Sequence, residues 1–241
     1  MSNNILFVFE GEKTEVQIIE NLQKHFINEN VSVHCVYGGE IYQIFKKIQD
    51  DDDLDTFSLL KERSKENEDA LKDYKRDDFA EIYLFFDYDG HSKIADDDKI
   101  KDLLAFFNEE TEKGKLFISY PMVESLKHVI SNQDFQNSCV ECKENINYKK
   151  IVSEQAQKQL LDFTIYDVDL WKELISLHLK KMNNLCVSTF TLPKQLFTQL
   201  EIFQNQETRF IIPYKKVSIL SAFPVFIHDY YGNVKTLSKI E

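Results

Sequence analysis

The sequence has no long apolar run, little arginine and few cysteines, and each shortage narrows what the chain can be. No stretch approaches the ~20 consecutive apolar residues of a membrane-spanning helix. The first residues lack the basic start and the small-residue cleavage site of a signal peptide. We therefore expect a cytoplasmic protein with no membrane partner. With 43% hydrophobic and 29% charged residues in 241, the composition is that of a globular chain.

Cysteine is too sparse to predict a metal site or a disulfide framework. Cys139 and Cys142 form a single C-x-x-C, but a structural zinc ion needs a second pair of ligands. The remaining candidates, Cys186, His128 and His178, do not repeat a metal-ligand spacing. We expect free thiols and no zinc.

Positive charge is also in short supply, which argues against a broad basic face for nucleic acid. The net charge is −12, and arginine occurs only at Arg63, Arg76 and Arg209. Acidic runs are usually solvated surface, so a nucleic-acid site remains possible where lysines gather near it. Such a site would depend on lysine, without the two-pronged hydrogen bonding of arginine.

The most informative stretch is IYLFFDYDGH, residues 82 to 91. Ile82–Phe86 reads as a buried strand of a parallel sheet. Asp87 and Asp89 follow it, and Gly90 predicts a turn, so both carboxylates lie at the carboxyl end of the strand, where open α/β sheets bind ligands. Carboxylates held this close favour a hard divalent cation, Mg²⁺ or Mn²⁺. The alternative is an ordinary turn, because D-x-D is common by chance.

An earlier strand ends in the same way. Ile5–Phe9 is a buried-strand pattern followed by Glu10 and Gly11. Apolar residues at helical spacing then run from Val16 to Phe26, with Thr14 as the expected N-cap. Two separate strands therefore each deliver an acid at the carboxyl end.

The next segments predict further strand and helix units. We expect a strand over 31–37, a helix over 40–48, an exposed helical excursion over about 50–80, a helix over 100–107 that ends at Gly114, and a strand over 116–120. The triplet Asp96–Asp98 is interpreted as the start of the helix at 100, because negative charge is favourable there.

The last part of the chain predicts a helical insertion and a return to the sheet. Helical periods run over 148–163 and 170–182, with Asp169 as the expected cap of the second. Strands are expected at 185–192 and 209–212, and residues 217–231 form either a kinked helix around Pro224 or a strand pair. The predicted organisation is a core at 1–130, a helical insertion at 131–184 and a C-terminal segment at 185–241 that returns to the core.

The fold class is therefore α/β, with a mostly parallel Rossmann-like sheet flanked by helices. FVFEGEKTE at 7–15 together with LFFDYDG at 84–90 resembles the TOPRIM domain of topoisomerases and bacterial primases. The form E-G-E-K-T-E resembles the OLD and RloB-type TOPRIM proteins of bacterial anti-phage defence. Tyr120-Pro121 followed by Glu124 resembles a further, weaker segment of that subgroup. The resemblance covers about residues 5–127, with a longer spacing between its two motifs than a compact TOPRIM has.

This resemblance implies a Mg²⁺-dependent nuclease, a toxic effector that hydrolyses DNA or RNA beside an ABC- or AAA-type ATPase, with a homo-oligomer possible. It implies that Asp87, Asp89 and Glu10 hold the metal, that Glu10 also acts as general acid or base, and that Lys13 contacts the scissile phosphate. Secondary candidates are Glu12, His91 and Glu124. For Lys13 the ordinary reading is a solvated surface residue.

Two other readings stay open. Haloacid-dehalogenase-like phosphatases also carry a hydrophobic D-x-D motif, in which Asp87 would be the nucleophile. This chain, however, has His91 where that family usually has Thr or Val, and the phosphatase reading leaves Glu10 unexplained. A non-catalytic TOPRIM-like binding or regulatory module is the third reading, which the net charge of −12 favours. Covalent topoisomerase or primase chemistry would need further domains.

Overall fold

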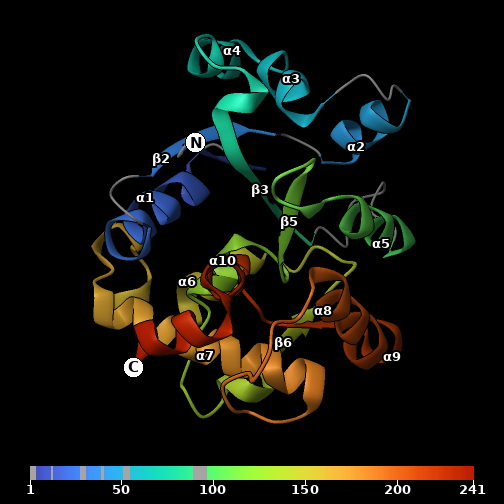
Figure 1. Ribbon diagram of the computed structural model, residues 1–241. Helices are drawn as coiled ribbons and strands as arrows, with labels where there is room; N and C mark the ends of the chain where they lie inside the picture. Colours follow the sequence, from blue (N-terminus) through green and yellow to red (C-terminus); the bar gives the residue numbers. More distant parts are fainter. Residues whose placement is uncertain (1–3, 12, 28–30, 39–40, 51–54, 89–96) are drawn as a thin grey trace. The chain divides into compact units, whose positions relative to one another are not determined.

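The chain is an α/β protein. The computed structural model describes residues 4–11, 13–27, 31–38, 41–50, 55–88 and 97–241. The chain divides into two compact units, one of residues 1–86 with 98–116 and one of residues 87–97 with 117–241. In Figure 1 the strands of the first unit run from blue to green, and the long helices near the end of the chain are orange to red.

A mostly parallel five-stranded sheet dominates the first unit, as the apolar runs predict. The strand order is β2-β1-β3-β5-β4. β1 is parallel to β2 on one side and to β3 on the other, and β4 is antiparallel to β5. The strands are β1 (Asn4–Phe9), β2 (Ser32–Tyr37), β3 (Phe79–Asp87), β4 (Asn108–Glu109) and β5 (Gly114–Ser119).

The helices that follow the strands are α1 (Thr14–Phe26), α2 (Ile41–Asp50), α3 (Thr56–Lys61), α4 (Lys65–Leu71) and α5 (Asp97–Phe106). Thr14 is the first helical residue of α1, and the cap position is Lys13, so the predicted N-cap is wrong by one residue. The described part of the excursion before β3, residues 55–78, is mainly helical, as predicted. It is not simply exposed, because Phe57, Leu60 and Leu71 are buried.

Gly114 begins β5, whereas the sequence predicted that it ends the preceding helix. α5 ends at Phe106, and the short strand β4 intervenes. Gly114 has φ +106°, and a Cβ atom there would lie 2.5 Å from Leu84 Cδ1 and 3.1 Å from Ile82 Cγ2. The glycine is therefore required by its backbone conformation and by the close approach to β3.

A side chain hydrogen-bonds the last residue of the outermost strand β2. Asn67 of α4 accepts from the Tyr37 N–H at 3.0 Å and donates to the Tyr37 carbonyl at 2.7 Å. Its amide also donates to the Leu60 carbonyl at 2.9 Å. One buried asparagine thus joins α3, α4 and the carboxyl end of β2.

The second unit is mainly helical. Its elements are the 3-10 turn η2 (Val123–Leu126), η3 (Phe135–Asn137), β6 (Cys139–Glu141), α6 (Tyr148–Gln155), η4 (Lys158–Leu160), η5 (Phe163–Ile165), α7 (Val168–Val187), α8 (Gln199–Gln206), the π-helical turn η6 (Glu207–Ile211), α9 (Ile212–Tyr214), β7 (Lys216–Ser218) and α10 (Ala222–Ile240).

Three predictions for this unit are wrong. The helix expected over 148–163 stops at Gln155 and is followed by 3-10 turns. Residues 185–192 form the end of α7 and a loop, and residues 209–212 belong to η6 and the start of α9, so neither segment is a strand. β7 pairs with β6 in a separate two-stranded sheet and does not join the five-stranded one.

The helical reading of residues 217–231 is confirmed for α10. Pro224 lies in its first turn, where a missing N–H is tolerated. Gly232 interrupts the helix with φ 72° and ψ 164°. The helix continues to Ile240, so the kink predicted for the tail is caused by Gly232 and not by Pro224.

A buried lysine holds part of the second unit together. Lys181 of α7 is 1% exposed, and its ammonium donates to the carbonyls of Phe135, Gln136 and Ser138 at 2.7, 3.0 and 2.6 Å. Burial lowers the pKa of Lys181 to about 7, with Cys139 opposing that shift. Its role is therefore to satisfy carbonyls around η3.

None of the helices described has both the length and the apolar character needed to cross a membrane.

Candidate functional site

Asp87 is the last residue of β3 and is partly exposed. The next residue, Tyr88, is buried, and its hydroxyl donates to Asp97 Oδ1 at 2.9 Å. Burial, with a smaller contribution from Asp97, raises the pKa of Tyr88. Asp87 is thus more exposed than Tyr88, which follows the end of β3. Asp89 and His91 lie outside the described residues.

Glu10 follows β1 at the same end of the sheet. Its N–H donates to the Phe85 carbonyl at 3.3 Å, which ties the end of β1 to the last part of β3. In the strand order β2-β1-β3, the strand that follows β1 in the sequence, β2, lies on one side of β1, and the next strand, β3, lies on its other side. The carboxyl ends of β1 and β3 therefore form a topological switch point, the usual ligand position in open α/β sheets.

The other predicted residues near Glu10 are less informative. Lys13 is exposed and caps α1 through its backbone, since its carbonyl accepts from the Gln17 N–H at 3.0 Å. Glu12 lies outside the described residues. Glu15 is buried, and its Oε1 accepts from the Gly11 N–H at 3.2 Å, which supports the turn after Glu10.

Glu124, a secondary candidate from the sequence, is a buried acid in the second unit. It lies on η2, shortly after the cis peptide bond Tyr120–Pro121. Its side chain is 7% exposed, and Oε1 lies 3.7 Å from Lys149 Nζ. Oε2 is buried and has no hydrogen-bond partner among the described residues. A buried polar atom without a partner costs about 1–3 kcal/mol, more when charged.

Tyr148, at the start of α6, is a buried phenol whose pKa is affected by two acids, Glu124 and Asp87. Burial raises the pKa of Tyr148 well above its ordinary value, and the carboxylates of Glu124 and Asp87 add to the shift. Both acids therefore lie within electrostatic range of one phenol.

A neutral histidine orients that phenol. His128 Nε2 lies 3.1 Å from Gln155 Oε1, and Nδ1 lies 2.9 Å from the Tyr148 hydroxyl. Because Gln155 Oε1 only accepts, Nε2 carries the proton and Tyr148 donates to Nδ1. Burial lowers the pKa of His128, with Gln155 opposing the shift, which favours the neutral ring. The phenol oxygen keeps its lone pairs as acceptors.

Lys127 completes this group, which we call the acid cluster: Asp87, Glu124, Lys127, Tyr148 and Lys149. Burial lowers the pKa of Lys127, Glu124 opposes that shift and Lys149 adds to it. Lys127 Nζ also lies 4.7 Å from the centroid of the Phe163 ring. Sequence reasoning missed Tyr148, His128 and both lysines. His128 lies four residues after Glu124, and this spacing was the one available signal.

Several acids and thiols have the structural roles that the sequence suggested. Asp97 accepts from Lys143 Nζ at 2.5 Å, and Asp98 pairs with Lys101 at 3.1 Å, while Asp96 lies outside the described residues. In the second D-x-D, the helix cap is Asp167 and not Asp169, because Asp167 accepts from the Leu170 N–H at 2.8 Å. All four cysteines are free thiols, as expected.

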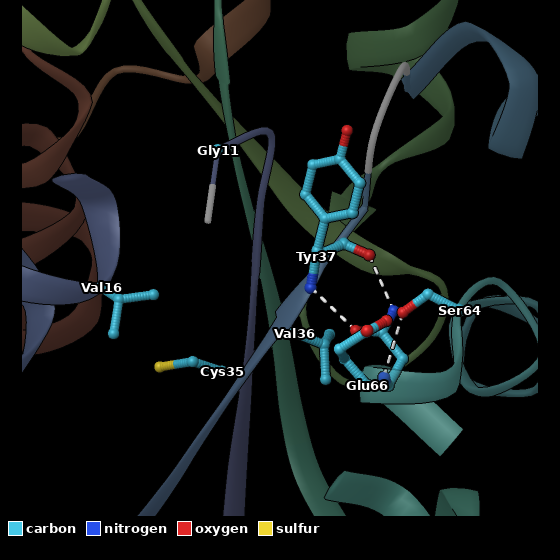
Figure 2. A pocket seen from close by; sticks show the side chains of 8 residues that line it. Gly11, Val16, Cys35, Val36, Tyr37, Ser64 and Glu66 are labelled. Carbon is cyan, nitrogen blue, oxygen red and sulfur yellow. Dashed lines mark hydrogen bonds between the residues drawn. The ribbon is translucent and has the colours of Figure 1, made fainter. Parts of the chain in front are cut away.

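The first unit also has a pocket of about 390 Å³ beside the carboxyl ends of β1 and β2 (Figure 2). Burial raises the pKa of the Cys35 thiol on its wall to about 12, so this thiol is unreactive. The dashed lines that start at the labelled Tyr37 in Figure 2 mark its two hydrogen bonds with Asn67. The pocket is lined by Gly11, Val16, Cys35, Val36, Tyr37, Ser64, Glu66 and Asn67.

The acid cluster contains two carboxylates, those of Asp87 and Glu124, as candidate ligands for a divalent cation. No group of three His, Cys, Asp or Glu side chains with metal-binding geometry occurs in the described parts of the chain, which omit Asp89 and Glu12. The fit rests on Glu124, whose buried Oε2 lacks a partner. Carboxylate oxygens are the ligands that Mg²⁺ and Mn²⁺ prefer. Asp87 and Glu124 would supply two of them.

Comparison with protein-family models, with curated proteins and with solved structures found no match to this chain.

Proposed function

We propose that the protein is a TOPRIM-type, Mg²⁺-dependent nuclease that hydrolyses phosphodiester bonds of DNA or RNA, with Mn²⁺ as an alternative ion. One observation carries the proposal. Glu10 and Asp87 follow or end neighbouring parallel strands, at the switch point where such sheets bind ligands. The E-G-E-K-T-E and D-x-D motifs that resemble the OLD and RloB-type proteins fall at these two strand ends.

In this proposal Asp87, Asp89 and Glu10 hold the metal ion, as the resemblance to TOPRIM proteins implies, and Glu124 is a secondary candidate. A bound divalent cation neutralises charge on the phosphate and lowers the pKa of a bound water. The Tyr148 hydroxyl donates a hydrogen bond to His128 Nδ1, so its oxygen can accept a hydrogen bond from a water molecule. Lys13, at the exposed start of α1, contacts the phosphate. Glu10 is the general acid or base.

The biological role that we propose follows from the same resemblance. The protein would be the toxic effector of a bacterial anti-phage system in the cytoplasm, controlled by an ABC- or AAA-type ATPase, with a homo-oligomer possible. An effector of this kind must be held inactive, so we expect weak cleavage by the isolated chain. A Walker-motif ATPase encoded beside this gene is the simplest supporting observation.

The test compares Glu10→Ala and Asp87→Ala with the unaltered chain, using plasmid DNA, an RNA transcript and p-nitrophenyl phosphate in Mn²⁺. Equal loss of polynucleotide cleavage in both variants supports the nuclease. Hydrolysis of p-nitrophenyl phosphate that is lost only with Asp87→Ala supports the phosphatase. Asp98→Ala is the matched control, because Asp98 is an exposed acid that pairs with Lys101 on α5.

The second candidate function is a non-catalytic binding or regulatory module. The net charge of −12 favours it, since a polyanion gains little from such a surface. In cells that carry the whole defence system, this function predicts that protection against phage survives both alanine substitutions. Loss of protection with Glu10→Ala and Asp87→Ala, but not with Asp98→Ala, excludes it.

A further inference from the structure

The pocket of the first unit has the size of a small-molecule site. Its volume of about 390 Å³ lies toward the lower end of the range of about 300–1,000 Å³ that is usual for ligand pockets. It therefore has room for one nucleoside-sized group and not for a duplex. One of its lining residues is Gly11, which follows Glu10 directly, so the pocket lies beside the acid at the end of β1.

Hydrogen bonds hold two walls of this pocket in place. Asn67 is 3% exposed and binds both backbone groups of Tyr37 and the Leu60 carbonyl, which fixes the end of β2 against α4 (Figure 2). A second wall is fixed where the Gly11 N–H donates to Glu15 Oε1 at 3.2 Å. A ligand therefore meets walls that are already ordered, which lowers the entropic cost of binding.

The side chains on the walls disfavour an anion and favour a flat ring. Of the eight described residues that line the pocket, Glu66 is negatively charged and none is cationic. Val16 and Val36 supply apolar surface, and Tyr37, which is 37% exposed, supplies an aromatic ring. A phosphate group would be repelled by Glu66. A planar base with hydrogen-bond donors on its edge would fit the ring and the carboxylate together.

A carboxylate on the wall also distinguishes one nucleobase from the others. Guanine has two adjacent donors, N1–H and N2–H, and one carboxylate can accept from both. Adenine and cytosine each place one donor beside a ring nitrogen that accepts, and uracil places one donor between two carbonyls. A carboxylate has no proton for those acceptors. Glu66 therefore favours guanine.

We propose that this pocket binds the base of one unpaired guanosine, with Glu66 accepting from the donors of the base and the Tyr37 ring packed against its face. The inference rests on the proposed function, in which the phosphate attached to this nucleotide lies at Glu10. In a duplex the same guanine donors are paired with cytosine. The substrate of the proposed nuclease is therefore a single strand, cut next to guanine.

Calorimetry on the whole chain tests the pocket with guanosine, adenosine, cytidine and uridine. We expect guanosine to bind at least about fivefold more tightly than the other three, because a bidentate contact discriminates by this factor or more. Glu66→Gln should abolish the preference, since an amide has one acceptor and not two. Glu68→Gln is the matched control, because Glu68 is an exposed acid in the same first turn of α4 and is not among the lining residues.

Two substitutions test the aromatic wall. Tyr37→Phe keeps the ring and should keep guanosine binding, whereas Tyr37→Leu should weaken it by about fivefold or more, because stacking on the ring is lost. Both leave the backbone groups that Asn67 binds, and urea unfolding shows whether each variant is folded.

Equal affinity for the four nucleosides would overturn the inference, as would a preference for guanosine that survives Glu66→Gln. Arginine methyl ester is a further probe, because a guanidinium group also presents paired donors to a carboxylate. If it binds more tightly than guanosine, the inference is wrong and the pocket takes a cationic side chain of a partner protein.

Cleavage mapping separates this inference from the proposed function. In Mn²⁺ the unaltered chain should cut an end-labelled single strand next to guanine, and Glu66→Gln should cut next to all four bases. Guanosine binding that depends on Glu66, in a chain that cuts neither polymer alone or within the whole system, contradicts the nuclease and supports the pocket. Cutting without base preference, equal in Glu66→Gln, supports the nuclease and contradicts the pocket.

Discussion

Lys149 Nζ lies 3.7 Å from Oε1 of Glu124, too far for a hydrogen bond, while Oε2 of the same carboxylate has no partner among the described residues. This ion pair contributes little to the stability of the fold. A buried charge that is only loosely paired costs more than it contributes. Its geometry makes sense as an arrangement that a bound cation would complete.

The first prediction separates stability from cation binding at Glu124. Glu124→Gln removes a buried charge and keeps the shape, so we expect the free energy of unfolding in EDTA to stay equal or to rise by up to about 1 kcal/mol. The stabilisation that the unaltered chain gains from Mg²⁺, about 2.7 kcal/mol at 100 times the dissociation constant, should shrink strongly. Urea unfolding followed by fluorescence of the buried Trp171 measures both.

The control for this prediction is Glu154→Gln, because Glu154 is a 63% exposed acid on α6. It should change neither quantity by more than about 0.5 kcal/mol. A Glu124→Gln variant that is destabilised in EDTA and still stabilised fully by Mg²⁺ would show that Glu124 is a structural acid.

The second prediction concerns acid pH. Burial lowers the pKa of His178 to about 3, while the Leu126 carbonyl opposes that shift. Its Nδ1 accepts from the Ser221 N–H at 3.1 Å, so the neutral ring is part of the fold. With an unfolded pKa near 6.5, the unfolded chain takes up the proton first. The contribution of His178 is therefore fully present above pH 6.5 and is lost as the pH falls toward 3.

Between pH 7 and pH 5 this loss amounts to about 2 kcal/mol in the free energy of unfolding. Burial also lowers the pKa of His34, His128 and His228, so they act in the same direction. Denaturant unfolding at a series of pH values checks this. His178→Asn keeps an acceptor for the Ser221 N–H and should flatten the profile. A chain equally stable at pH 7 and pH 5 would contradict the assignment.

The third prediction uses two glycines with positive φ. At Gly114 an added Cβ meets Leu84 Cδ1 at 2.5 Å, whereas at Gly232 it has no atom within 4 Å. Gly232→Ala should cost about 1–3 kcal/mol, because φ 72° with ψ 164° is a backbone conformation that essentially only glycine adopts. Gly114→Ala also adds an overpacked contact, which should cost about 1–3 kcal/mol more than the strained backbone alone. Unfolding by urea measures both, and equal costs would mean that β3 and β5 are not as close as described.

The fourth prediction tests the buried ammonium of Lys181. Lys181→Met fills a similar volume but leaves the carbonyls of Phe135, Gln136 and Ser138 without their donor, at a cost of about 3 kcal/mol or more. Lys180→Met, at the neighbouring and more exposed position of α7, is the control. If the two variants unfold at the same urea concentration, Lys181 does not hold η3.

The sequence predicted the sheet well because its strands are uninterrupted apolar runs. Ile5–Phe9 and Ile82–Phe86 cannot be amphipathic helices of useful length, and glycine or acid follows each, so a buried parallel sheet was the remaining choice. The second unit was harder. The run at 185–192 is rich in residues that favour strands, but residues 185–187 continue α7 and residues 188–192 form a loop.

Only some residues of the candidate site have a signal in the sequence. An acid at the end of a strand is visible in the sequence, because the strand fixes where it lies. Tyr148 and Lys149 approach Glu124 from an element more than twenty residues away, and no local pattern records such a contact. Residues like these are found by tertiary structure alone.

Asn67 has one last consequence, for the behaviour of the protein at high concentration. β2 is an edge strand of the sheet, and the backbone N–H and C=O groups of an edge strand can pair with a strand of another chain. Asn67 hydrogen-bonds both backbone groups of Tyr37, so these groups at the carboxyl end of β2 cannot pair with another chain. Asn67→Ala should therefore promote aggregation beyond what its loss of stability explains.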